Sequence, residues 1–146
     1  MIEAKVTLTQ PTKPGRQFVA SAAGHHFVID DKDGATGPKP IDLVAAGLAG
    51  CTAFDVISIL RKKRQKVTGY EVFVEADQAA QPPAVFTEVR IRHVITGDVD
   101  PAAVEDAIRL SEEKYCSVGN MVNKTARFVT SYELLTDANV ETVVSR

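Results

Sequence analysis

The sequence has only two cysteines among its 146 residues and a formal net charge of only -2, and each of these shortages excludes a class of protein. One cysteine pair cannot make the dense disulfide framework of a small secreted domain. A chain of this length, with 45% hydrophobic residues, can bury a core without such a framework. The near-neutral charge gives no long-range attraction to nucleic acid or to an anionic membrane. We therefore predict neither partner.

The spacing typical of metal sites is also missing. His25 and His26 are adjacent on an expected strand, so their side chains point to opposite faces and cannot easily share one ion. His93 lies on an apolar strand face, where a hydrogen-bonded core histidine is the favoured interpretation. We predict no metal site.

The first residues do not make a signal peptide, because Glu3 and Lys5 interrupt them and no apolar stretch follows. The expected location is the cytoplasm, where thiols stay reduced unless they turn over. A cysteine pair in that compartment is catalytic or inert rather than structural.

No internal repeat, low-complexity segment or linker divides the sequence, so we predict one domain over residues 1–146. Alternating polarity predicts strands at Glu3–Thr9, Gln17–Ala22, His25–Asp30, Tyr70–Ala76, Val89–Ile95 and Ala126–Leu135. Helices are expected at Pro40–Lys63, after the capping pair Asp100 and Pro101, and from Ser117. The polar tail after the last strand is expected to fray. This order is not a regular strand–helix alternation, so we predict an α+β fold with antiparallel strand pairing.

The expected helix Pro40–Lys63 is apolar nearly all round over its first two-thirds, which predicts burial on several sides. Its Leu43–Leu60 portion resembles a membrane span, but Asp55 lies inside it and a central charge disfavours insertion. A buried central helix is therefore the favoured interpretation. The partner of Asp55 is left open between Arg64 and a residue of a partner subunit.

The two cysteines have different surroundings. Cys51 ends the small apolar run Val44–Cys51, whereas Cys116 follows a polar stretch and stands at an expected helix start near Lys114. Those neighbours make Cys116 the better placed thiol for reactivity. Each cysteine is the other's only partner for an intramolecular disulfide.

Apolar burial raises the pKa of the Cys51 thiol, and Asp55 one helical turn later raises it further. A cation would have to offset both effects, and the candidates are Arg16, His25 and His26. Taken alone, the residues leave Cys51 open between a redox thiol and a small buried hydrophobe in a tight helix contact.

Two blocks of the sequence match a known pattern. Gly37–Leu43 leads into Ala45–Val56, which holds the first cysteine, and Glu113–Val118 surrounds the second cysteine 65 residues beyond it. The pattern resembles the OsmC/Ohr family of osmotically inducible and organic hydroperoxide resistance proteins, and its OsmC-like branch in particular. The resemblance covers nearly the whole chain. It implies the OsmC/Ohr-like fold, an intertwined homodimer with antiparallel sheets around long central helices and active sites at the subunit interface.

The resemblance also implies a thiol peroxidase. Cys51 would attack an organic hydroperoxide and become a sulfenic acid, which Cys116 would resolve as a disulfide. An external dithiol, often of lipoyl type, would reduce the disulfide, with no metal, haem or flavin. Arg16 is the arginine that matches the activating arginine of the family's first strands. Val44, Leu48 and Phe54 share the helical face of Cys51 and would line an apolar substrate pocket, which favours fatty or aromatic hydroperoxides.

One departure from the family pattern keeps other functions open. The peroxidases of the family carry a glutamate in the opening turn of the long helix, where this chain has Ile41 with Asp42 beside it. This difference motivates a second hypothesis, a non-catalytic module of the same fold that binds a small apolar ligand. A third hypothesis is a thiol–disulfide exchange protein whose oxidant is another disulfide.

Overall fold

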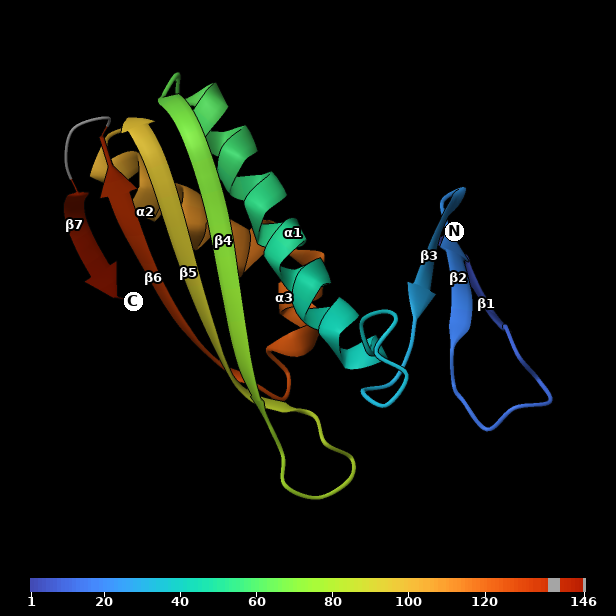
Figure 1. Ribbon diagram of the computed structural model, residues 1–146. Helices are drawn as coiled ribbons and strands as arrows, with labels where there is room; N and C mark the ends of the chain where they lie inside the picture. Colours follow the sequence, from blue (N-terminus) through green and yellow to red (C-terminus); the bar gives the residue numbers. More distant parts are fainter. Residues whose placement is uncertain (137–139, 146) are drawn as a thin grey trace. The chain divides into compact units, whose positions relative to one another are not determined.

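The computed structural model describes residues 1–136 and the backbone of residues 140–145 (Figure 1). The chain divides into two compact units, Met1–Val44 and Ala45–Arg146, and each unit has its own sheet. The elements confirm a mixed α+β fold. The single domain expected over residues 1–146 stays a prediction.

The first unit is a three-stranded antiparallel sheet. Its strands are β1 (Ala4–Leu8), β2 (Phe18–Ala22) and β3 (His25–Ile29), in the order β1-β2-β3. The register pairs Val6 with Ala20 and Ala20 with Phe27, so these residues share one apolar face. On this face Val6 keeps 53% and Phe27 keeps 41% of their surface exposed, whereas Ala20 between them is buried.

The second unit combines helices with a four-stranded sheet in the order β4-β5-β6-β7. Along the chain its elements are α1 (Pro40–Lys62, which begins in the first unit), β4 (Lys66–Gln78), β5 (Phe86–Asp98), α2 (Pro101–Leu110), the π-helical turn η1 (Ser111–Tyr115), α3 (Ser117–Val122), β6 (Arg127–Leu135) and β7 (Val140–Ser145). All the predicted strands and helices are confirmed, and β4 and β5 extend beyond their predicted ends.

Two expectations about the sheet were wrong. β5 and β6 pair in parallel, because α2, η1 and α3 together form a crossover that returns the chain to the same end of the sheet. The tail that was expected to fray contributes β7, which pairs antiparallel with β6. The other pairings are antiparallel as predicted.

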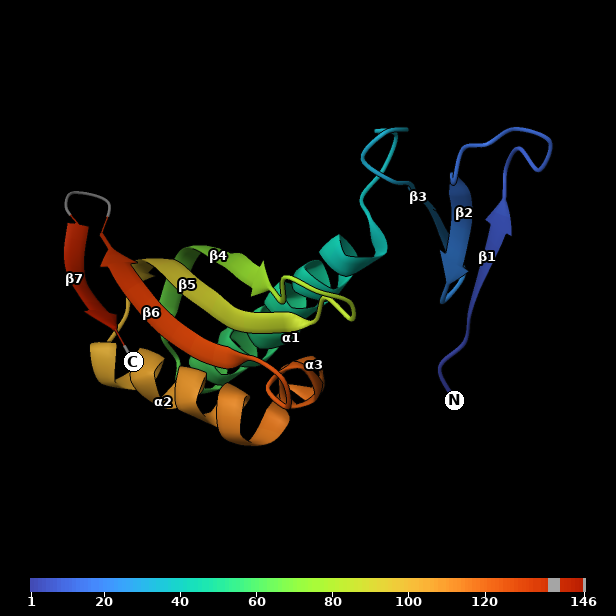
Figure 2. The ribbon, with the colours of Figure 1, turned by 90° about the horizontal axis from the view of Figure 1, so that it is seen from below.

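The core lies between the four-stranded sheet and the two longer helices, which cover the same face of that sheet (Figure 2). α2 begins as predicted: the Asp100 carboxylate accepts a hydrogen bond from the backbone N–H of Ala102 at 3.0 Å, and Pro101 is the first helical residue. The buried residues of the core are Val56, Leu60, Ile95, Ala103, Val104, Ala107, Ile108, Tyr132 and Leu134. Burying side chains of this size contributes about 1.5–3 kcal/mol each.

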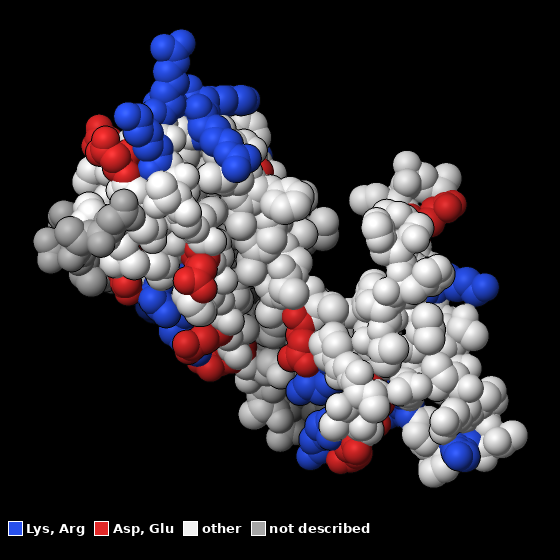
Figure 3. All heavy atoms as spheres, turned by 45° about the horizontal axis from the view of Figure 1, so that its top comes forward, with Lys and Arg blue, Asp and Glu red and all other residues white. Residues whose placement is uncertain are grey.

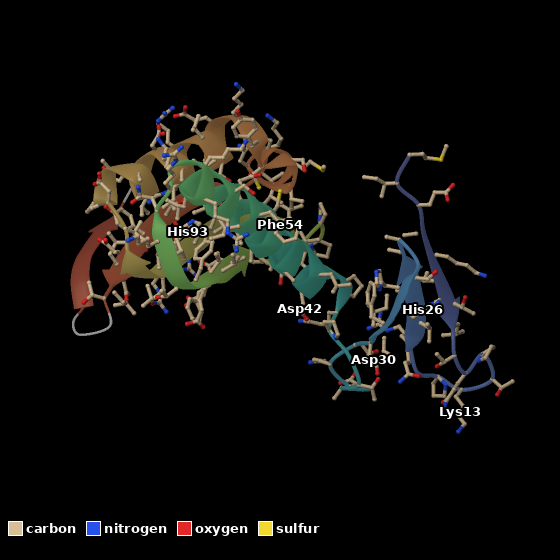
Figure 4. All side chains as sticks on the ribbon, turned by 90° about the horizontal axis from the view of Figure 1, so that it is seen from above. Lys13, His26, Asp30, Asp42, Phe54 and His93 are labelled. Carbon is tan, nitrogen blue, oxygen red and sulfur yellow. The ribbon has the colours of Figure 1, made fainter. Side chains whose placement is uncertain are left out.

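Within this chain α1 buries one stripe, and its burial on several sides in a dimer stays a prediction. Leu48, Thr52, Val56 and Leu60 recur every fourth residue, which places them on one face of the helix. Phe54, on another face of α1, is 77% exposed (Figure 4). The chain supplies one sheet and one neighbouring helix, and these cover only the inner face.

By length and composition alone, α1 is apolar enough to cross a membrane. Within the chain, 22% of its most apolar 18-residue stretch is buried. The packing of Val56 and Leu60 into the core is that of a core helix. The basic end Arg61–Arg64 is exposed, as expected for a solvated helix end. Figure 3 shows Lys and Arg gathered where α1 leads into β4.

His93 is the hydrogen-bonded core histidine that the sequence predicts. It is 1% exposed, and its Nδ1 lies 2.7 Å from the hydroxyl oxygen of Tyr70. Its Nε2 atom has no hydrogen-bond partner among the described residues. Burial lowers the pKa of His93 to about 4 from its ordinary value of 6.5, so the ring is neutral at pH 7.

This pKa predicts an acid-sensitive fold. Unfolded His93 binds a proton near pH 6.5 and the folded ring only near pH 4, so stability present above pH 6.5 is lost as the pH falls toward 4. The loss should reach about 3 kcal/mol for this residue alone. Urea unfolding at pH 7 and pH 4.5 should show it, and His93→Gln, which keeps an acceptor for Tyr70, should lose measurably less over this range. Equal losses in both proteins would contradict the assignment.

Candidate active site

The two cysteines lie together in the second unit. The Sγ atoms of Cys51 and Cys116 and a carboxylate oxygen of Asp55 all lie within 4.8 Å of one another. Both thiols are free, and Cys116 is buried at 2% exposure while Cys51 is half-buried. The site therefore has one accessible sulfur and one enclosed sulfur, with a carboxylate beside both.

Cys116 is held in place by the turn that precedes it and the helix that follows. Its backbone N–H donates to the carbonyl of Ser111 at 2.8 Å, which closes the π-helical turn η1. Its Sγ accepts a hydrogen bond from the N–H of Gly119 at 3.2 Å and so caps α3. A Cβ at position 119 would lie 3.0 Å from this sulfur and 3.6 Å from Leu48 Cδ1, so the glycine allows the close approach. Single π-helical turns of this kind are frequent at functional sites.

The surroundings of Cys51 favour its ionised form. Burial raises the pKa of the thiol, but interactions with the Cys116 thiol, the backbone N–H of Val118 and the Ser117 hydroxyl lower it below its ordinary value. The Ser117 Oγ atom lies 3.8 Å from Cys51 Sγ. The charge of Asp55 opposes this lowering. Groups of the second unit therefore offset the effect of burial on the pKa of Cys51. The sequence predicts a cation in this role.

Cys116 has the opposite character. Burial raises the pKa of its thiol to about 12, and the interaction with the Cys51 sulfur and the charge of Asp55 act in the same direction. Lys114 lies over the ring of Tyr115, with its Nζ 5.2 Å from the ring centroid. The expectation that Cys116 is the better placed thiol was therefore wrong. Of the two thiols, Cys51 is therefore the more readily ionised, and Cys116 stays protonated at neutral pH.

A buried chain of hydroxyl groups fixes the carboxylate of Asp55. The hydroxyl of Ser111 donates to Asp55 Oδ2 at 2.9 Å and lies 3.1 Å from the hydroxyl of Thr52. Since Ser111 donates its proton to Asp55, the Thr52 hydroxyl donates to Ser111. The sequence left the partner of Asp55 open between Arg64 and a partner subunit. Ser111 is the hydrogen-bond partner, and no local pattern could link residues 56 positions apart.

The remaining predicted site residues are spread more widely. Leu48 is buried near Cys116, whereas Val44 is 39% exposed and Phe54 largely exposed. Arg16 belongs to the first unit, where its Nε atom pairs with Asp31 Oδ2 at 3.0 Å. His25 and His26 are exposed on β3 of that unit (His26 is labelled in Figure 4). The roles assigned to these residues stay predictions.

Comparisons with known proteins agree on one family. The model of the OsmC-like protein family matches residues 31–131. Protein YhfA of Escherichia coli is 40% identical over 116 residues, which cover 79% of this chain and 87% of YhfA. A hypothetical protein from Aquifex aeolicus is 28% identical in sequence and has a TM-score of 0.84, over 94% of this chain and 98% of that one.

A structure of an organic hydroperoxide resistance protein from Elizabethkingia anophelis is more distant. It shares 20% identity with a TM-score of 0.63, over 95% of this chain and 96% of that one. At this identity the likeness shows the fold alone.

The interaction between the two neighbouring thiols predicts how Cys51 responds to substitution of Cys116. Cys116→Ala removes the donor, so the pKa of Cys51 should rise, whereas Cys116→Ser keeps an O–H donor and should shift it less. The rate of iodoacetamide alkylation of Cys51, followed across pH, measures this pKa because the thiolate is the reacting form. A midpoint in Cys116→Ala equal to that of the wild type would show that the Cys116 thiol does not support the thiolate.

Proposed function

The chain belongs to the OsmC-like protein family, and from this premise we propose that it is a thiol peroxidase that reduces organic hydroperoxides with Cys51 and Cys116. The observation that carries the proposal is the pairing of a half-buried thiol of lowered pKa with an enclosed, protonated thiol within 4.8 Å. The first is suited to attack, and the second is close enough to resolve the product. The fold is shared with a protein named for organic hydroperoxide resistance.

The proposed cycle has three steps. The Cys51 thiolate attacks the terminal oxygen of the hydroperoxide, so an S–O bond forms, the O–O bond breaks and the alcohol leaves after taking a proton from water. Cys116 then attacks the sulfenic sulfur of Cys51, which forms the disulfide and releases water. An external dithiol reduces this disulfide by exchange and is itself oxidised to a disulfide.

The cycle needs no metal, haem or flavin, because the two sulfurs and the external dithiol carry both electrons. A lipoyl group is our leading candidate for the dithiol, and the cytoplasm is the expected compartment because its thiol pools keep such reductants available. We assign Val44, Leu48 and Phe54 to the substrate pocket and Arg16 to stabilisation of the reacting sulfur.

We also propose the intertwined homodimer. Phe54 on α1 is mostly exposed in the single chain, and the apolar sheet face of the first unit presents Val6 and Phe27. Large exposed apolar side chains, here present on each unit, are typical of an interaction surface. A second copy of the chain would cover them.

One observation favours the non-catalytic alternative. The first unit has a cleft of about 450 Å³ whose apolar lining residues include Phe18, Ile29 and Ile41, beside the charged residues Arg16, Asp30, Asp31 and Lys39. Ile41 stands where the family's peroxidases carry glutamate, so this cleft is the place to expect a small apolar ligand.

The peroxidase proposal predicts dependence on each thiol. With a dithiol reductant, Cys51→Ser should abolish consumption of cumene hydroperoxide. Cys116→Ser should allow one oxidation of Cys51 to a sulfenic acid but no intramolecular disulfide. Peroxide consumption and mass spectrometry of the thiols measure both effects.

Equal activity of the wild type and Cys51→Ser would end the peroxidase proposal. Reaction of the wild-type thiols with disulfides but not with hydroperoxides would single out the exchange protein. Thiols inert to both, together with a higher melting temperature in the presence of an apolar ligand, would favour the binding module.

The dimer proposal predicts that a charge at Phe54 separates the subunits. Phe54→Asp should lower the mass in sedimentation analysis to that of one chain, because an unpaired carboxylate would be buried at the interface. Phe73→Asp is the matched control. Phe73 lies on β4, and its ring centroid is 4.4 Å from the guanidinium carbon of Arg92 on β5. A monomeric wild type, or equal masses for the wild type and Phe54→Asp, would count against the proposed interface.

A further inference from the structure

Asp55 is the one member of the cysteine cluster that the proposed cycle leaves without a role. Its negative charge disfavours ionisation of both neighbouring thiols. A carboxylate in this position therefore works against the nucleophile of the first step. The hydroxyls of Ser111 and Thr52 hold it there in an ordered arrangement.

We propose that Asp55 accepts the proton of Cys116 when Cys116 attacks the oxidised Cys51. The inference rests on the proposed redox pairing of these two cysteines and adds a proton acceptor for its resolving step. In that step the Cys116 S–H bond breaks, the S–S bond forms and the S–O bond of the sulfenic acid breaks. The proton passes through Asp55 to the leaving hydroxide, which departs as water, so atoms and electrons balance.

The need for an acceptor follows from the burial of Cys116. A thiol reacts as its thiolate, and this sulfur is enclosed and protonated at neutral pH. Once Cys51 is oxidised, the proton of Cys116 must leave before the S–S bond can form. Bulk solvent reaches the buried sulfur poorly, so a group within the site has to take the proton.

The geometry fits this role. The carboxylate oxygen of Asp55 and Cys116 Sγ lie within 4.8 Å, a distance that a small approach or one bridging water can span. Ser111 positions both partners, because its hydroxyl donates to Asp55 and its carbonyl accepts from the N–H of Cys116. Ser111 therefore makes hydrogen bonds to both Asp55 and Cys116, the acceptor and the attacking residue.

Asp55 also has a way to release protons. It lines a cleft of about 430 Å³ together with Ser58, Ile59, Lys62, Lys63, Asp106, Leu110 and Tyr115. The charged groups of this cleft besides Asp55 are Lys62, Lys63 and Asp106, and Lys63 pairs with Asp106 at 2.8 Å. Burial and the charge of Asp55 raise the pKa of the Tyr70 hydroxyl, which stays protonated at neutral pH.

The two effects of Asp55 predict opposite outcomes for Asp55→Asn, which makes the test sharp. If the carboxylate acts only through its charge, its removal makes both thiols more acidic and accelerates both oxidation and resolution. If it accepts the proton, the attack of Cys51 is unimpaired while the attack of Cys116 slows by about 100-fold, as is usual for loss of a positioned base.

DTNB, a symmetrical aromatic disulfide, tests the resolving step without any hydroperoxide. Cys51 displaces one thionitrobenzoate and forms a mixed disulfide, and Cys116 then displaces the second thionitrobenzoate and forms the protein disulfide. The two releases are followed by absorbance in a stopped-flow instrument. In Asp55→Asn the second release should slow about 100-fold and should rise more steeply with pH than in the wild type, because hydroxide must replace the lost acceptor.

Asparagine keeps an oxygen that can accept from Ser111, so the variant should fold, and its melting curve checks this. Glu113→Gln is the matched control: it removes an exposed carboxylate of η1 that pairs with Arg109, and it should leave the second release unchanged. A second release in Asp55→Asn that is as fast as in the wild type, or faster, would overturn the inference. A wild type that releases only one thionitrobenzoate would also overturn it. Biphasic release with a slow Asp55→Asn phase, but no hydroperoxide consumption by the wild type, would support the inference and remove only the peroxidase proposal.

Discussion

The enclosure of the Cys116 sulfur between η1, α3 and α1 sets the chemistry of the whole site. Because that sulfur is buried, it keeps its proton. Its interaction with the Cys51 sulfur, together with Val118 and Ser117, lowers the pKa of Cys51, which burial alone would raise. The two thiols therefore differ because their surroundings differ. A symmetrical pair of exposed cysteines would have neither a defined nucleophile nor a defined resolving group.

The fold carries this arrangement on rigid elements. Val56 and Leu60 anchor α1 in the core, and Val104 and Ile108 anchor α2 against the same sheet. α2 runs directly into η1, so the position of the core determines where Cys116 meets the helix of Cys51. The polar groups that this meeting buries satisfy one another through the chain from Thr52 through Ser111 to Asp55. An unpaired group in such a place would cost about 1–3 kcal/mol.

Sequence patterns predicted what depends on neighbouring residues and missed what depends on distant ones. The alternation around His93 identified a core histidine, and the pair Asp100 and Pro101 identified the start of α2, because both signals are local. The burial of Cys116 was missed, since a polar flanking sequence says nothing about the helix that closes over it. The parallel pairing of β5 with β6 was missed because the pattern of a strand reports its buried face and not the direction of its partner.

The groups around Cys51 change the interpretation of Ile41. The peroxidases that this chain resembles carry a glutamate at this position. In this chain Ser117, Val118 and the Cys116 thiol lower the pKa of Cys51, and all belong to the same unit as the sulfur. A nucleophile stabilised by donors on α3 needs less from a cation on the first strands. The charge of Asp55 raises the pKa of Cys51, but the other groups lower it enough that the carboxylate can stay beside the sulfur. Such a site gives up part of the acidity of Cys51 in the first step and gains a proton acceptor for the second. This arrangement increases the overall rate where the attack of Cys116, rather than the first attack by Cys51, limits the cycle.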